Sequence, residues 1–407
     1  MKRLLFGLVF VLSAAVAFSP NLLAQEVAFG GIELASSSVK GLTFTFQPGT
    51  DAGVRGAARP DRMKRLQYAE RNASFISMKD GCRLAERGMD LLVKDLGEVV
   101  DELREGARAK NLGTLQLFVV GSSGLGAVCN TAEIVARVQA ATGLCAEFIT
   151  ASDEAKYTLG FVLPRDRYRS LIINISGGNT LGGYYVATRG AAWPPREWHG
   201  FEIKYGSRTL KDRALALSKD PHVSTQGTTL PPLDYYQAVD AVLQKEVMPV
   251  LDEIKEENSG LESFGQLYMV GGAIWATSTR TKPMQQEEWA IASLTMADFD
   301  HVLAKVKDGT FGTFDGSEFS ERVSAKTRDA AELELKDVLT RFDPQSLYAG
   351  VALARFIVQQ TTPTAHVYFP TTAAWISGYA REKFRENGTR VPSCAVSSPA
   401  EAHNQSD

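Results

Sequence analysis

The chain has 407 residues, of which 44% are hydrophobic and 22% are charged, and its net charge is −3 at pH 7. This composition is typical of a globular protein long enough for two domains, and it shows no sign of disorder over most of the length. The charge gives no electrostatic support for a nucleic-acid partner, since loss of Lys2 and Arg3 with a leader would lower it to −5 (−3 − 2).

Residues 1–24 have the pattern of a signal peptide. Lys2 and Arg3 precede an apolar run, 4–18, that is too short to serve comfortably as a permanent membrane anchor. Cleavage could follow Ala17 or Ala24, and Ala24 is preferred because the first predicted strand needs little chain before it. We therefore expect a periplasmic or secreted protein without a stable membrane anchor. An uncleaved anchor is the alternative.

The four cysteines are widely spaced and form no CxxC motif. In an oxidising compartment they allow three pairings, between which the sequence does not choose. Buried free thiols are an equal alternative, and the spacing does not match a zinc site. The residues are Cys82, Cys129, Cys145 and Cys394.

The first predicted element after the leader is a hairpin over residues 31–46. An apolar strand that contains Glu33 leads into Ser36, Ser37 and Ser38, here called the first turn, and residues 42–46 return as a strand. A loop rich in glycine, alanine and arginine follows at 48–59. Its basic residues are either part of a solvated loop or a rim that attracts polyanions above a cleft. The candidates for that rim are Arg55, Arg59, Arg62 and Arg65.

The middle of the first half alternates helices and strands. Helical periodicity over 78–110 precedes a strand at 114–120, a helix at 131–142 and a strand at 146–150. Ser152, Asp153 and Glu154 then begin a helix that runs towards Phe161. Acidic residues in a first helical turn often only complement the helix dipole, which is the alternative to a functional role for this pair.

Residues 171–188 repeat the plan of the first hairpin. A strand that contains Asn174 leads into Ser176, Gly177, Gly178, Asn179 and Thr180, here called the second turn, and 181–188 return as a strand. Glycines let the backbone close on a ligand, and consecutive N–H groups form an anion site. Asn174 lies 141 residues (174 − 33) after Glu33. This repetition indicates two related lobes whose turns face each other, with room for a polyphosphate chain between them.

Beyond the second hairpin, helices are predicted at 233–257, 296–307, 327–340 and 346–359, and strands at 267–270 and 366–369. This alternation indicates an α/β architecture of two lobes with a cleft. The expected lobes are 27–165 and 168–385, followed by a disordered tail at 386–407.

Several common catalytic motifs are absent from the sequence. It contains no GxxxxGK[ST] phosphate loop, no GxGxxG after a strand and no GxSxG elbow. The five histidines show no metal-ligand spacing. The sequence therefore argues against a serine hydrolase, a zinc hydrolase and a nicotinamide enzyme.

These segments, in this order, resemble the exopolyphosphatase/guanosine pentaphosphate phosphatase (Ppx/GppA) family of the actin-like superfamily. Residues 32–38 resemble its first phosphate turn, 149–156 its Glu-Glu-Ala segment, and 174–180 its Asp-Ile-Gly-Gly-Gly-Ser-Thr turn. Weaker matches are 205–208, 271–273 and 347–350. The resemblance extends over about residues 30–385 and implies two actin-like (ribonuclease H-like) lobes with a cleft between them.

The resemblance also implies the roles of individual residues. Glu154 would be the base for the attacking water, and Mg²⁺ or Mn²⁺ would lie near Glu33 and Asn174. The two turns would hold terminal phosphates, because phosphoryl transfer needs charge neutralisation and a positioned water rather than covalent help. The implied phosphate-binding residues are Ser36, Ser37, Ser38, Ser176, Gly177, Gly178, Asn179 and Thr180.

The sequence departs from the family pattern at five places. Gly126-Ala127 stands in place of an Arg-Asp/Glu pair, and the late Leu-Arg-Glu-Gly is lost around residues 375–378. The other three departures lie in or next to the two hairpin turns. Asn174 stands in place of an aspartate, Leu181 in place of an acid, and Glu33 in place of an aspartate. An amide contributes no charge to Mg²⁺, and losing one preorganised stabilising group commonly costs about 10²–10³ in rate. Binding without turnover is therefore an alternative to catalysis.

Two hypotheses follow. The chain is an exported phosphoanhydride hydrolase that acts on inorganic polyphosphate or a nucleotide polyphosphate, or it is a catalytically weakened relative that binds such a ligand. Export favours inorganic polyphosphate over cytoplasmic guanosine nucleotides. A kinase-like or apyrase-like activity is a third option. The sequence does not give the oligomeric state, and a homodimer is one possibility.

Overall fold

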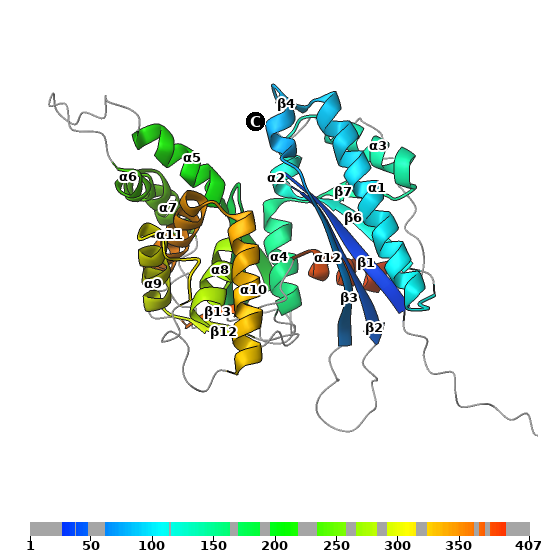
Figure 1. The fold of residues 1–407 in the computed structure, drawn as a ribbon. Coiled ribbons are helices and arrows are strands. Elements are labelled where there is room, and N and C mark those ends of the chain that lie inside the picture. The colour runs from blue at the N-terminus through cyan, green and yellow to red at the C-terminus, as the bar shows by residue number, and fades with distance from the viewer. Residues whose placement is uncertain are drawn as a thin grey trace, which may run out of the picture.

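The chain folds into two α/β lobes, each built on one mixed sheet (Figure 1). The predicted fold class is therefore confirmed. This computed structural model describes residues 27–36, 38–47, 62–113, 115–162, 170–187, 196–218, 234–257, 266–282, 291–314, 324–361, 366–370 and 375–387.

The first sheet has the strand order β3-β2-β1-β6-β7. Its strands are β1 (Val27–Ala35), β2 (Ser38–Gln47), β3 (Arg62–Asn72), β6 (Leu115–Gly121) and β7 (Ala146–Phe148). The first three form an antiparallel meander, and the last two run parallel to β1. Helices α1 (Glu86–Ala109) and α3 (Thr131–Thr142) pack their apolar faces against one side of this sheet.

The second sheet has the strand order β10-β9-β8-β11-β13-β12. Its strands are β8 (Ser170–Ile175), β9 (Thr180–Ala187), β10 (Arg196–Ile203), β11 (Gln266–Gly271), β12 (Ile291–Leu294) and β13 (His366–Pro370). The large core of this lobe joins one face of the sheet to helices α5 (Ser207–Ser218), α6 (Tyr235–Val242), α7 (Met248–Glu257), α8 (Gly272–Thr281), α9 (Met296–Lys307), α10 (Ala325–Arg341) and α11 (Pro344–Thr361). A π-helical turn, Leu243–Val247, joins α6 to α7.

The two meanders share one register, as the predicted repeat requires. In the first lobe Glu33 pairs with Lys40, which pairs with Glu70 on the third strand. A shift of 141 residues takes the first pair to Asn174 and Leu181, which are also paired. Leu181 in turn pairs with Glu202 on β10, so Glu202 occupies the place that Glu70 has in the first lobe.

Helix α4 (Ala151–Val162) lies between the lobes (Figure 1) and packs on both. Ala155 and Leu159 contact Leu181 and its neighbours on the second sheet. On the other side, Phe161 packs with α12 (Trp375–Asn387) against the first sheet. The ring of Phe384 on α12 stacks on Phe29 of β1 at 4.7 Å. The end of the range predicted for the second lobe, 168–385, thus packs against the first sheet.

Several predicted boundaries were wrong. The helix expected from residue 78 begins at Glu86, because a small hairpin of β4 (Lys79–Asp80) and β5 (Arg83–Leu84) comes first. Gly81 forms its turn with a φ of +59°, which a glycine adopts without strain. Strands β3, β10 and β12 and helices α5, α8 and α12 were not predicted.

The three cysteines in the described ranges form disulfides and are not free thiols. Cys82, in the turn of the small hairpin, is bonded to Cys129. Cys145 is also disulfide-bonded, and Cys394 lies outside the described residues. The predicted signal peptide lies outside them as well. The predicted tail, 386–407, was placed two residues too early, because α12 runs to Asn387, and its remainder lies outside the described residues. None of the helices in the described ranges is long and apolar enough to cross a membrane.

Candidate active site between the two lobes

Glu154 lies in the first turn of α4, and its side chain is buried. The Ser123 N–H, at the start of the short helix α2 (Ser123–Gly126), donates a hydrogen bond to Glu154 Oε1. The neighbouring Asp153 has a different role, since its carboxylate accepts from the Thr150 hydroxyl at 2.7 Å and caps the helix. Of the two acids at this helix start, Asp153 serves the helix and Glu154 faces the interior.

The pKa of Glu154 is raised to about 8. Burial is the largest cause, because removing water disfavours the charged carboxylate. The charges of Glu33 and Glu202 raise the pKa further, whereas the hydrogen bonds from Ser123 lower it. Since Glu33 belongs to the first lobe and Glu202 to the second, Glu154 responds to acids from both.

The first turn lies beside α2. A Cβ at Gly124 would lie 3.5 Å from the Ser36 hydroxyl, so Ser36 faces the same short helix that binds Glu154. Ser38 is 1% exposed, and its hydroxyl has no hydrogen-bond partner among the described residues. Glu33 is buried, and Lys40 Nζ lies 3.8 Å from Glu33 Oε2. Ser37 lies outside the described residues.

The second turn is tied to the start of α5. The N–H groups of Ser207 and Arg208 donate to the carbonyls of Ser176 and Gly177, each at 2.9 Å. The Thr180 hydroxyl donates to the Tyr205 carbonyl at 2.8 Å. Added Cβ atoms at Gly177 and Gly178 would meet nothing within 4 Å, so these two glycines border open space.

The three segments with weaker family matches, 205–208, 271–273 and 347–350, pack together next to the second turn. A Cβ at Gly206 would lie 2.4 Å from the Ser176 carbonyl, and one at Gly271 would lie 2.1 Å from the Ile175 carbonyl. A Cβ at Gly350 would be 2.8 Å from both Ala273 and Ser207. Segments distant in sequence therefore pack so closely that side chains at these glycines would displace the second turn.

Glu202 was missed by the sequence analysis. Its Oε1 accepts a hydrogen bond from Asn179 Nδ2 at 2.7 Å, and its charge reaches Glu154. A groove of about 240 Å³ lies next to it, lined by Thr150, Ala151, Ser152, Gly200, Phe201 and Glu202. Glu154 is thus joined by a hydrogen bond to α2, beside the first turn, and is affected by the charge of Glu202, which is hydrogen-bonded to Asn179 of the second turn.

Comparison with solved structures relates this fold to that of Ppx/GppA proteins. A Ppx/GppA family member from Aquifex aeolicus matches with a TM-score of 0.55 at 15% identity, covering 89% of this chain and 99% of that one. An exopolyphosphatase from Cytophaga hutchinsonii matches with a TM-score of 0.57 at 14% identity, covering 90% and 100%. This chain has their fold. An exopolyphosphatase-like protein gives a TM-score of 0.56 at 14% identity, covering 89% and 99%.

At these identities the likeness establishes the Ppx/GppA fold and leaves the activity open. No family model matches the chain, and a search of curated proteins finds no match. The expected two-lobed fold is confirmed, while the roles of individual residues stay predictions.

Within the Ppx/GppA fold, two of the predicted rim arginines lie far from the turns. Arg65 pairs with Phe44, six residues along β2 from Ser38, which corresponds to about 20 Å. Arg62 pairs with Gln47, farther still. The rim is therefore not supported at these two residues, because β3 carries them to the opposite end of the sheet. Arg55 and Arg59 lie outside the described residues.

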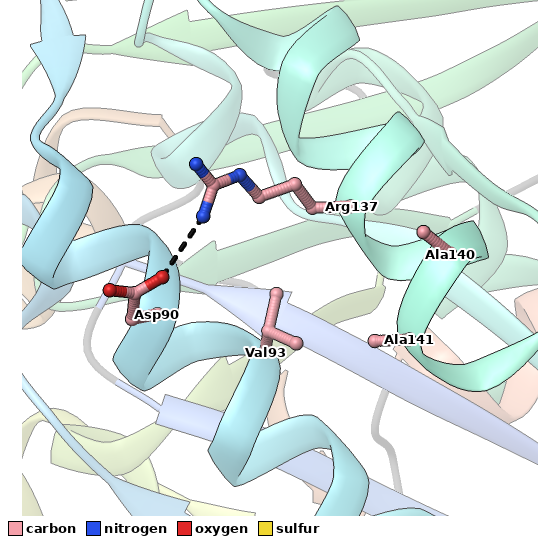
Figure 2. A pocket seen from close by; sticks show the side chains of 5 residues that line it. All are labelled: Asp90, Val93, Arg137, Ala140 and Ala141. Atoms are coloured by element: carbon pink, nitrogen blue, oxygen red, sulfur yellow. Dashed lines mark hydrogen bonds and ion pairs between the residues drawn. The ribbon is translucent and has the colours of Figure 1, made fainter.

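A second hollow, of about 370 Å³, lies between α1 and α3. Figure 2 shows Arg137 pointing from α3 towards Asp90 on α1, above Val93, Ala140 and Ala141. Arg137 Nη1 and Asp90 Oδ1 are 2.9 Å apart. The charged groups here neutralise each other, and Glu154 is not among the lining residues, so this larger hollow is not the candidate active site.

Both lobes carry oxygen donors of the kind that a hard divalent cation prefers. Glu33 and Glu202 bring carboxylate oxygens from opposite lobes, and Asn174 on β8 has an amide oxygen. No three His, Cys, Asp or Glu side chains in the described ranges are placed to hold a metal ion together. Mg²⁺ does not require such a cage, because it is commonly held by one or two carboxylates, several waters and substrate phosphates.

Proposed function

We propose that the protein is an exported phosphohydrolase that releases terminal phosphate from inorganic polyphosphate. The observation that carries this proposal is the position of Glu154, which is buried on α4, the helix that packs on both lobes, and is affected by the charges of Glu33 from the first lobe and Glu202 from the second. A carboxylate removed from water, beside the first turn and affected by the charge of Glu202 on the second lobe, would be suited to orient a water for attack on a phosphate held by both turns.

Residues of both turns and of α4 would each have a role in the reaction. Ser36 and Ser38 of the first turn and the N–H groups of the second turn would hold non-bridging phosphate oxygens, and Lys40 would add positive charge. Glu154 Oε1 is fixed by the Ser123 N–H, which leaves Oε2 to accept a hydrogen bond from water. A divalent cation, when bound near Glu33, Glu202 and the amide oxygen of Asn174, would offset phosphate charge.

The protonation state of Glu154 makes the proposed activity dependent on that cation. With its pKa at about 8, the carboxyl group is mostly protonated at neutral pH in the ligand-free protein. A protonated carboxyl cannot accept a proton from water. Positive charge brought to the site would lower this pKa and restore the base.

Two features support export. Residues 1–24 have the signal-peptide pattern, and the Cys82–Cys129 disulfide is of a kind that persists in oxidising compartments. Outside the cytoplasm, inorganic polyphosphate is a more accessible substrate than guanosine nucleotides.

A second candidate function is binding of polyphosphate without turnover. Leu181, where the resembled family has an acid, is fully buried against Ala155 and Leu159 of α4, directly behind Glu154. It offers no oxygen to a cation, and Asn174 offers no charge. This local replacement of acids favours a site that retains its shape and has lost part of its catalytic charge.

Phosphate release from long-chain polyphosphate separates the two functions. The purified mature protein is assayed with Mg²⁺ and with Mn²⁺, beside Glu154→Gln, and polyphosphate binding is measured in parallel. Release that is abolished in Glu154→Gln supports the hydrolase, whereas binding without release supports the second candidate. Neither binding nor release, with nucleotide polyphosphates included, would overturn both.

A further inference from the structure

The Ser176 hydroxyl occupies the inside of the second turn. The N–H groups of Gly178 and Asn179 both donate to Ser176 Oγ, each at 3.2 Å. These are two of the N–H groups that a bound phosphate would need. In the ligand-free protein the side-chain oxygen therefore lies where a phosphate oxygen would be bound.

A chain of hydrogen bonds fixes the orientation of this hydroxyl. Ser176 Oγ lies 2.8 Å from Asn179 Oδ1 and 2.9 Å from the Asn179 main-chain oxygen, both acceptors for its proton. Glu202 only accepts, so Asn179 turns its Nδ2 towards Glu202 and its Oδ1 towards Ser176. With its proton directed at Asn179, the hydroxyl presents its lone pairs to the two N–H groups.

The backbone of the turn does not depend on this contact. The carbonyls of Ser176 and Gly177 are held by the N–H groups that open α5, and the Thr209 hydroxyl donates to the Gly178 carbonyl at 2.8 Å. Ser176 N–H also donates to the Asn179 carbonyl at 3.0 Å. Rotation of one side chain can therefore free the Gly178 and Asn179 N–H groups while the turn keeps its shape.

We propose that Ser176 is an internal competitor for phosphate in the second turn, oriented by Glu202 through Asn179. The inference rests on the proposed function, because it takes polyphosphate as the ligand. Binding of a phosphate requires the Ser176 hydroxyl to leave, which lowers affinity. Removing the hydroxyl should tighten polyphosphate binding about tenfold, equivalent to about 1.4 kcal/mol.

Ser176→Ala, which removes the hydroxyl, and Ser176→Thr, which keeps it, form a matched pair. Amide hydrogen exchange over residues 176–180 of the ligand-free protein reports the contact without any ligand. Faster exchange in Ser176→Ala than in wild type and Ser176→Thr is expected, because the Gly178 and Asn179 N–H groups lose their acceptor. Equal exchange in all three proteins would show that the hydroxyl does not cap the turn, and would overturn the inference.

The dissociation constant for polyphosphate, measured with Mg²⁺, tests the competition itself. Binding about tenfold tighter in Ser176→Ala than in Ser176→Thr supports the inference. Unchanged or weaker binding in Ser176→Ala, with wild type still binding, overturns the inference and leaves the proposed function intact. Faster exchange with no polyphosphate binding by any variant overturns both, since the turn then takes no phosphate.

Discussion

Glu154→Gln is expected to stabilise the ligand-free protein by an amount that grows as pH rises from about 5 to 8. The folded-state pKa of Glu154 is raised from 4.5 to about 8, so the folded protein holds a proton that the unfolded chain has released in this range. Because the folded state binds more protons, stability falls with increasing pH. Below pH 4.5 both states are protonated and the effect disappears.

The size of the effect follows from the same pKa difference. By linkage it corresponds to on the order of 5 kcal/mol at pH 8 and above, and relaxation around the charged form reduces this to about 2–5 kcal/mol. The amide introduced by Glu154→Gln is uncharged, and its oxygen can still accept a hydrogen bond from the Ser123 N–H. The variant therefore does not lose folding stability through this position as pH rises. For a chain of this size, we expect its melting temperature to exceed that of wild type by about 2–6 °C at pH 8.5.

Thermal unfolding at half-unit steps between pH 4 and pH 9, without divalent cations, measures this difference. Glu253→Gln, at an exposed position of α7, controls for loss of one negative charge. Addition of Mg²⁺ and polyphosphate should reduce the advantage of Glu154→Gln, because positive charge favours ionised Glu154. A difference between Glu154→Gln and wild type that stays constant over the whole pH range would refute the raised pKa.

Three further predictions concern the frame around the site. Arg341 Nη1 of α10 lies 2.8 Å from Glu70 Oε2 of β3, and this ion pair joins the two lobes. Arg341→Gln should therefore lower the melting temperature and increase the radius of gyration in X-ray scattering. The control is Arg355→Gln, which should leave the radius of gyration unchanged because the partner of Arg355, Asp300, is in the same lobe. Identical scattering for wild type and Arg341→Gln would contradict that role. The double variant Cys82→Ser/Cys129→Ser should lose about 2–5 kcal/mol in denaturant unfolding, because the bond closes a 47-residue loop in the unfolded chain, and an unchanged midpoint would contradict this. Gly206→Ala should abolish polyphosphate binding, because the new Cβ would displace the Ser176 carbonyl. The control Gly97→Ala should bind polyphosphate normally, because its new Cβ meets nothing within 4 Å. Normal binding by both variants would show that the second turn tolerates the shift.

The hairpins and the start of α4 were predictable because their signals are local. A strand, a small-residue turn and a returning strand are contiguous in sequence, and the repeat at 141 residues brought Glu33 and Asn174 to matching positions. The repeated hairpin, together with the alternation of strands and helices, also predicted the two α/β lobes. Glu154 could be singled out because two acids open a helix, although only the structure separates it from Asp153.

Other features depend on contacts between distant segments. Glu202 lies on an unpredicted third strand. What connects it to the site is its hydrogen bond with the Asn179 side chain, which lies 23 residues earlier in the sequence. Its equivalence to Glu70 could have been found by extending the repeat to a third strand in each lobe. Helix α12 was missed because its packing depends on Gly378, where a Cβ would lie 2.1 Å from the Tyr157 carbonyl on α4. The positions of Arg62 and Arg65 on β3 were not predicted, because this edge strand is rich in charged residues and does not show strand periodicity.

The most direct measurement is hydrogen exchange of the whole protein with and without polyphosphate, in the presence of Mg²⁺. If both turns and Glu154 form one site, peptides over residues 33–38, 123–126 and 176–180 should become protected together and with the same dependence on polyphosphate concentration. Protection of one turn without the other, or protection confined to other surfaces, would contradict a shared site between the lobes.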